Sequence, residues 1–229
     1  MKVITLVVIL VIVILVTVCC GGSRDTFTNK HTKHEEDIKK CFAEVMTQEE
    51  DRILSDLIDA WSMVTKELNI RWSICAGTYI GAIRNGGRIP WDDDFDVTVL
   101  KEDIPKLEKM GDILAPLSIS VAKFWGGYKI FYNDNRAVTR HDKYGWNWPF
   151  IDIFTCSYGV SKECYALDKS ELPLREMKFG NTKVFVAENM SSARPPMKTD
   201  KWKTELIDTG YRHRLEGRYA NGCETRPVE

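Results

Sequence analysis

The chain has 229 residues, and its 32 Lys and Arg residues against 33 Asp and Glu residues give a formal net charge of −1. A chain so close to neutrality lacks the basic excess of a general nucleic-acid-binding protein, so we predict no nucleic-acid partner. Its hydrophobic fraction of 44% is sufficient for one folded domain with appended segments.

The N-terminal segment is almost uninterrupted Val, Ile and Leu over residues 3–18. A bilayer span needs roughly 20 apolar residues, with a lower limit near 17. The run therefore favours a transmembrane signal anchor over residues 1–20, in contact with the membrane through residues 3–20. This anchor predicts a single-pass protein of the Golgi or ER with a lumenal catalytic domain. The alternative is a cleaved signal peptide, which would make the protein secreted.

Polar residues follow the apolar run and predict a linker or stem over residues 21–43. The next segment, residues 44–216, contains the alternating helix and strand patterns and is the expected catalytic domain. Residues 217–229 are left as a C-terminal tail.

The first predicted helix spans residues 47–68, because Thr47 and Glu50 form a capping box and apolar residues recur every three or four positions after it. The later elements are expected in this order: a strand over 71–75, a helix over 79–84, a strand over 95–100, a helix over 101–114, strands over 117–124, 128–132 and 150–155, a hairpin of 175–179 with 182–187, and a helix over 201–207. The pattern predicts an α+β fold with one mixed sheet.

An acidic segment at residues 91–97 reads Trp-Asp-Asp-Asp-Phe-Asp-Val. Side chains alternate along a strand, so Asp94 and Asp96 point the same way. Two such carboxylates repel each other, and a divalent cation with a preference for oxygen ligands is the natural compensation. A solvated acidic loop is the plain alternative, but the apolar neighbours of the segment weaken it.

An EF-hand calcium loop would also use Asp92, Asp94 and Asp96. It requires Gly at the sixth position and Glu at the twelfth. Val97 and Asp103 occupy those positions, so this interpretation is rejected.

Asp152 lies inside the apolar stretch Ile-Asp-Ile-Phe of the predicted strand over 150–155. A buried carboxylate without a partner is costly. If this strand pairs beside the strand over 95–100, Asp152 joins the same site, and three Asp residues can hold two metal ions.

The segment Gly77-Thr78 precedes a short helix whose free N–H groups and dipole suit a phosphate. Arg84, about two turns further on, can reach phosphate oxygens. Lys129, on a predicted strand, is a further phosphate-binding candidate.

Two other features have an ordinary interpretation beside a functional one. The aromatic-rich segment at residues 144–150 either stacks on a sugar or base or packs in the core. His141 and His213 are isolated histidines, which are usually not catalytic.

Three stretches together resemble the LicD and fukutin-related family. They are Cys-Ala-Gly-Thr-Tyr-Ile-Gly-Ala-Ile-Arg at 75–84, Arg-Ile-Pro-Trp-Asp-Asp-Asp-Phe-Asp-Val at 88–97, and Trp-Pro-Phe-Ile-Asp-Ile-Phe at 148–154. The resemblance implies a nucleotidyltransferase-like fold, a mixed sheet with flanking helices. It also implies transfer of phosphocholine or a polyol phosphate from a CDP-linked donor to a glycan or glycoprotein.

The same resemblance assigns roles to individual residues. It implies Mg²⁺ or Mn²⁺ as the cofactor, held by four carboxylates: Asp92, Asp94, Asp96 and Asp152. Among these, the catalytic residues would be Asp94, Asp96 and Asp152. The residues expected on the donor phosphates are Gly77, Thr78 and Arg84.

Two other function classes remain as alternatives. A nucleotide-sugar glycosyltransferase also uses an Asp-x-Asp motif to bind a metal-nucleotide, but the upstream Gly77-Thr78 and the downstream Asp152 argue against it. A non-catalytic, glycan-binding relative is the other, and the presence of all three Asp residues argues against it.

Overall fold

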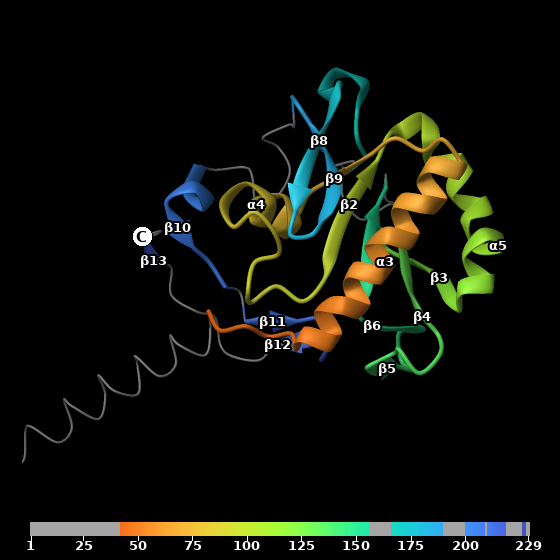
Figure 1. The fold of residues 1–229 in the computed structure, drawn as a ribbon, viewed down its shortest axis with the longest axis horizontal. Helices are drawn as coiled ribbons and strands as arrows, with labels where there is room; N and C mark the ends of the chain where they lie inside the picture. The colour runs from red at the N-terminus through yellow and green to blue at the C-terminus, as the bar shows by residue number, and fades with distance from the viewer. Residues whose placement is uncertain (1–41, 156–165, 190–199, 209, 219–225, 228–229) are drawn as a thin grey trace, which may run out of the picture. The chain divides into compact units, whose positions relative to one another are not determined.

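The computed structural model describes residues 42–155, 166–189, 200–208, 210–218 and 226–227 (Figure 1). The chain divides into the units Met1–Phe42 and Ala43–Glu229, and the fold described below is that of the second unit. The expected anchor over residues 1–20 lies outside the described residues. Within the described ranges, no helix is both long and apolar enough to cross a membrane.

A five-stranded mixed sheet forms the centre of the fold, as the sequence predicts. Its strands lie in the order β1 (Trp72–Ile74), β2 (Phe95–Val99), β7 (Phe150–Phe154), β4 (Gly127–Tyr132) and β3 (Ile119–Phe124). The β2–β7 pair is parallel and the other pairs are antiparallel. The parallel pair, β2 with β7, positions the acidic residues.

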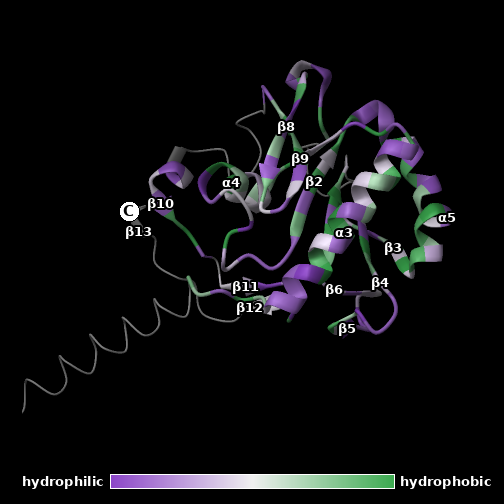
Figure 2. Ribbon diagram, viewed as in Figure 1, coloured by the Kyte–Doolittle hydropathy of each residue, from purple (hydrophilic) through white to green (hydrophobic). Residues whose placement is uncertain are grey.

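The helix α3 (Gln48–Glu67) packs against the sheet (Figure 1). Thr47 caps its N-terminus and shares the predicted capping box with Glu50. Hydrophobic and hydrophilic residues alternate along its ribbon (Figure 2), which is the pattern of a helix with one buried face. The buried face includes Trp61, whose ring meets that of Trp72 on β1 at a centroid distance of 5.8 Å.

Smaller elements surround this core. The remaining helical segments are α4 (Ala76–Arg84), η1 (Lys101–Lys109), α5 (Met110–Leu114), η2 (Ala115–Leu117), η3 (Lys169–Glu171) and η4 (Asp200–Lys203). The remaining strands form two-stranded pairs: β5 (Thr139–His141) with β6 (Trp146–Trp148), β8 (Leu174–Phe179) with β9 (Thr182–Ala187), β10 (Glu205–Leu206) with β13 (Arg226–Pro227), and β11 (Tyr211–Arg212) with β12 (Gly217–Arg218).

Four sequence predictions differ from the structure. The helix expected over 101–114 is a 3₁₀ segment followed by the short α5, and Pro105 in its first part removes an amide donor. The helix expected over 201–207 is wrong, because a 3₁₀ turn there gives way to β10. The helix expected from residue 79 begins earlier, at Ala76. The prediction of one sheet misses the four two-stranded pairs.

Candidate active site

Three carboxylates meet where β2 lies beside β7. Asp94 directly precedes β2, Asp96 lies on it, and Asp152 is the partner of Asp96 in the parallel register. Paired residues of neighbouring strands share one face of a sheet. The three residues are only 4%, 8% and 4% exposed, respectively. The structure thus brings together the three Asp residues that the sequence places in one site.

The buried carboxylates perturb one another. Burial raises the pKa of Asp96 well above its usual value, and the neighbouring charges of Asp94, Asp92 and Asp152 raise it further. Burial also raises the pKa of Asp152, to about 6, although the ammonium group of Lys129 opposes this effect. The site therefore carries more negative charge than its protein surroundings compensate.

Lys129 is directed at the site itself. It lies opposite Asp152 in the β4–β7 register, and its Nζ donates a hydrogen bond to Asp152 Oδ1. The same Nζ lies 3.4 Å from the ring centroid of Phe150. The charge of Lys129 therefore has a buried partner inside the protein, and its role toward a phosphate stays a prediction.

Asp93, which lies before β2, makes different contacts from its neighbours Asp92 and Asp94. Its two carboxylate oxygens accept hydrogen bonds from the backbone N–H groups of His213 and Arg214, at 3.0 and 2.9 Å. Its carbonyl oxygen accepts a hydrogen bond from Trp148 Nε1 at 2.6 Å. Asp93 therefore attaches the C-terminal segment to the acidic site.

His213, which the sequence analysis set aside as an isolated histidine, lies beside the acidic residues. Its Nε2 lies 3.0 Å from Asp94 Oδ2, and its ring packs edge-on against Phe150 and Tyr211. One oxygen each of Asp94 and Asp152 and one ring nitrogen of His213 all lie within 4.8 Å of one another. No local motif surrounds this histidine, so the sequence offers no signal that would have found it.

The start of α4 supports the acidic residues from the other side. Thr78 is buried and its Oγ1 accepts a hydrogen bond from the Asp96 N–H at 2.8 Å, so this hydroxyl positions β2, and its contact with a donor phosphate stays a prediction. A Cβ on Gly77 would lie 2.5 Å from Asp92 Oδ2, so glycine is what permits their close approach. That oxygen is enclosed and, among the residues that the structure describes, has no hydrogen-bond partner. Burial, Asp94 and Asp93 raise the pKa of Asp92 well above its usual value.

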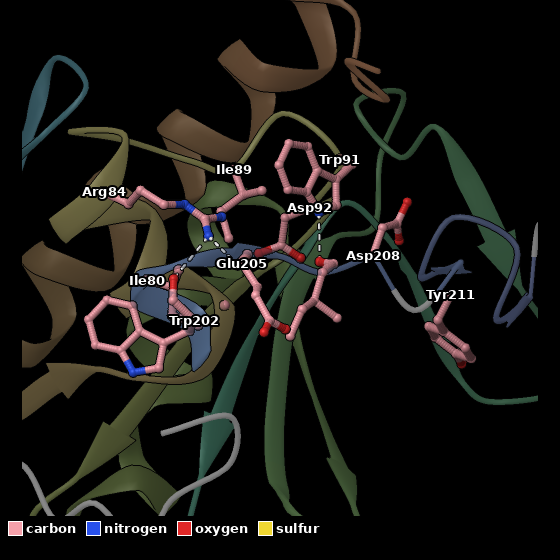
Figure 3. Close-up of a pocket in the computed structure, with 11 residues that line it drawn as sticks. Ile80, Arg84, Ile89, Trp91, Asp92, Trp202, Glu205, Asp208 and Tyr211 are labelled. Carbon is pink, nitrogen blue, oxygen red and sulfur yellow. Dashed lines mark hydrogen bonds between the residues drawn. The ribbon is translucent and has the colours of Figure 1, made fainter. Parts of the chain in front are cut away.

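A cavity of about 220 Å³ adjoins Asp92 (Figure 3). One wall comes from α4 through Gly77 and Arg84, and the opposite wall comes from residues 202–211. Arg84 donates hydrogen bonds to the carbonyl oxygens of Trp202 and Glu205, at 3.3 and 3.4 Å. Arg84 therefore lines the cavity, as a phosphate ligand would, but its guanidinium also holds the C-terminal wall.

Sequence comparison identifies the family of the chain. The model of the LicD/FKTN/FKRP family, nucleotidyltransferase domain, matches residues 69–189, which is more than half of the chain. The chain therefore belongs to this family. The matched segment contains α4, the acidic segment and Asp152, whereas His213 and the C-terminal wall of the cavity lie beyond it.

Individual relatives are more distant. An uncharacterized protein of Rickettsia prowazekii is 38% identical over 140 residues, which are 56% of this chain and 46% of the relative. The Lipopolysaccharide cholinephosphotransferase LicD of Haemophilus influenzae is 29% identical over 92 residues, which are 34% of this chain and 35% of the relative. The chain thus spans about a third to a half of the length of these relatives. By its printed name, the Haemophilus influenzae relative is a phosphotransferase.

Among solved structures, the crystal structure of ANT(2″)-Ia in complex with adenylyl-2″-tobramycin is 20% identical to the chain, with a TM-score of 0.35. The match covers 58% of this chain and 67% of that one. The likeness is too low to carry any argument about the site.

Proposed function

We propose that the chain is a metal-dependent phosphotransferase, which moves phosphocholine or a polyol phosphate from a CDP-linked donor to a glycan or glycoprotein. The observation that carries the proposal is the register of β2 with β7, which sets Asp96 opposite Asp152 within the family-matched segment and beside Asp94. The name of the Haemophilus influenzae relative, a cholinephosphotransferase of lipopolysaccharide, makes phosphocholine the first group to test.

The site suits Mg²⁺ or Mn²⁺. The carboxylates of Asp94, Asp96 and Asp152 are buried together, and the enclosed Oδ2 of Asp92 has no hydrogen-bond donor within the described ranges. The hydrogen bond from Lys129 compensates the charge of Asp152 in part, and the other carboxylates remain in excess. Hard divalent cations prefer such oxygen ligands. When bound, they would neutralise the donor diphosphate and the charge that develops on it during transfer.

The protein groups would then orient the reactants. A hydroxyl oxygen of the acceptor attacks the phosphorus atom that carries the transferred group. The bond from this phosphorus to the bridging oxygen breaks, and cytidine monophosphate leaves with the electron pair. Asp152, whose carboxylate is oriented by Lys129, is the group that we assign to orient the hydroxyl and accept its proton. The cavity between α4 and residues 202–211 would hold part of the donor beside Asp92.

A donor screen with the full-length chain tests the proposal. CDP-choline, a CDP-polyol and a nucleotide sugar are each supplied with a lipopolysaccharide or a glycoprotein glycan, and mass spectrometry identifies the released nucleotide. We expect cytidine monophosphate from a CDP-linked donor when Mg²⁺ or Mn²⁺ is present. Release of a nucleoside diphosphate from the nucleotide sugar would favour the glycosyltransferase alternative instead.

A matched pair of variants tests the role of the carboxylates. Asp96→Asn keeps the size of the side chain and removes its charge, so we expect turnover to be abolished while circular dichroism shows an intact fold. Asp112→Asn makes the same change at an exposed position of α5 and is expected to keep normal turnover. Near-normal turnover by folded Asp96→Asn, or full activity in excess EDTA, would rule out the mechanism.

The placement in the cell is a separate part of the proposal. The apolar run over residues 3–18 would anchor the chain in the Golgi or ER membrane, with the catalytic unit on the lumenal side. Carbonate extraction followed by N-terminal sequencing tests this. A soluble product that begins near residue 20 would show that the segment is a cleaved signal peptide.

A further inference from the structure

We propose that His213 is a nitrogen ligand of the metal ion that Asp94 and Asp152 would bind. This inference deepens the proposed function and rests on it, because it concerns the same metal site. His213 lies outside residues 69–189, so the ligand is not carried over from the match to the family. It comes from the C-terminal segment, which Asp93 attaches to the site.

The distances suit a shared ion. Ligands of Mg²⁺ lie about 2.1 Å from the metal, so adjacent ligands of an octahedron are about 3.0 Å apart and opposite ones about 4.2 Å apart. Nε2 of His213 and Oδ2 of Asp94 are 3.0 Å apart, which is the separation of adjacent ligands. The set of three atoms that includes Asp152 spans no more than 4.8 Å. Small side-chain movements are therefore enough to bring all three into one coordination shell.

The ring is oriented by contacts other than the carboxylates it faces. The backbone N–H of His213 is bound to Asp93, and the rings of Phe150 and Tyr211 pack against the imidazole at centroid distances of 5.2 and 5.0 Å. The Nδ1 atom is enclosed and makes no hydrogen bond within the described part of the chain. Packing and the backbone thus direct Nε2 toward Asp94 and Asp152 before any ion arrives.

The alternative is that His213 only donates a hydrogen bond to Asp94 and so positions that carboxylate. The two roles differ in what they do to metal preference. Mg²⁺ strongly prefers oxygen ligands, whereas transition-metal ions also accept imidazole nitrogen. A directly bound His213 should therefore increase the affinity for Mn²⁺ relative to that for Mg²⁺, and a positioning role should affect the two ions alike.

Pulsed electron paramagnetic resonance of the Mn²⁺-loaded, full-length protein separates these roles, because a coordinated imidazole nitrogen modulates the Mn²⁺ spin echo. We expect this modulation in the wild type and its loss in His213→Gln. The Mn²⁺ dissociation constant of this variant should increase by at least about tenfold, as for other losses of metal-site contacts, with a smaller change for Mg²⁺. His141→Gln is the matched control. It removes the other imidazole near this segment, whose Nε2 lies 3.1 Å from the His213 carbonyl oxygen, and should keep the modulation.

The possible failures are distinguishable. Bound Mn²⁺ without nitrogen modulation in the wild type, or modulation that survives in His213→Gln, overturns the inference and leaves the proposed function intact. A wild-type protein that binds neither Mn²⁺ nor Mg²⁺ refutes the metal-dependent function itself. If His213→Gln does not fold, the triple variant His31→Gln/His34→Gln/His141→Gln, which leaves His213 as the only histidine of the sequence, should keep the modulation, and loss of the modulation in it would overturn the inference.

Discussion

Replacing Lys129 by Met should make the stability of the fold depend more steeply on pH. The side chains of Lys129 and Asp152 are 4% and 5% exposed and form a buried ion pair. Met keeps most of the length of the side chain and its contact with the ring of Phe150, but removes the charge. Asp152 then faces the other carboxylates without its cation, so we expect its pKa to rise further above its usual value.

The magnitude follows from linkage between protonation and folding. An acid whose pKa is raised on folding lowers stability as pH increases from its unfolded-state pKa to its folded-state pKa, at about 1.36 kcal/mol per pH unit. For Asp152 in the wild type this loss begins near 3.8 and stops at about 6. In Lys129→Met the loss continues to higher pH. The stability deficit of the variant relative to the wild type should therefore grow between pH 6 and pH 8, by up to that amount per pH unit.

Urea unfolding of the full-length chain in EDTA and mild detergent, followed by tryptophan fluorescence at pH 5, 7 and 8, measures this difference. The double variant Lys129→Met/Asp152→Asn is the control, because it has no carboxyl group at position 152 to titrate. Its stability relative to the wild type should therefore show no deficit that grows with pH above pH 6. A stability loss in Lys129→Met that is the same at all three pH values would refute the reasoning.

Two further stability predictions concern the supporting framework. Burial alone would raise the pKa of Asp103, but hydrogen bonds led by Arg71 outweigh it and hold the pKa at about 2. Asp103→Asn should therefore lower the free energy of unfolding by about 1–2 kcal/mol at pH 7, a range that allows for the half-exposed Arg71. This difference from the wild type should vanish as the pH falls from about 4 to 2. A difference that stays constant in unfolding curves measured at acid pH would contradict the prediction. A Cβ on Gly81 would lie 2.5 Å from the Gly87 carbonyl oxygen, so Gly81→Ala should cost about 1–3 kcal/mol in urea unfolding. Gly111→Ala places its Cβ in open space on α5, so it should leave stability unchanged or raise it by up to about 1 kcal/mol. Equal effects of Gly81→Ala and Gly111→Ala would argue against a clash at Gly81.

The parts of the site that are close to regular strands were predictable from the sequence. The alternating pattern of residues 94–97 led to the expectation that Asp94 and Asp96 share a site, and both are buried there, although only Asp96 lies within β2. An Asp inside an apolar strand, as at position 152, needs a polar or charged partner, and this need indicated that its strand lies beside the acidic segment. The register of β2 with β7 provides that neighbour. The roles of these residues in metal binding and catalysis remain predictions.

The parts that depend on distant chain segments were not predictable. The pairing of Lys129 with Asp152 requires the order of strands in the sheet, which no local pattern contains. Likewise, the segment after residue 200 has a helix-like spacing of residues, yet Trp202 and Glu205 are held by hydrogen bonds from Arg84. Tertiary contacts of this kind override weak local propensity. His213 enters the site through the same segment and was therefore set aside.

The three consecutive residues Asp92, Asp93 and Asp94 make different contacts, so each has its own role in the structure. On one side of the backbone, Asp92 and Asp94 contribute charge to the site and its cavity. Asp93, in contrast, accepts hydrogen bonds with both of its carboxylate oxygens from the backbone N–H groups of His213 and Arg214. The same short segment would therefore provide the proposed metal-binding oxygens, and it fixes the part of the chain that would add a nitrogen. Since the C-terminal wall of the cavity belongs to that attached part, any change at Asp93 should disturb the metal site and the cavity together.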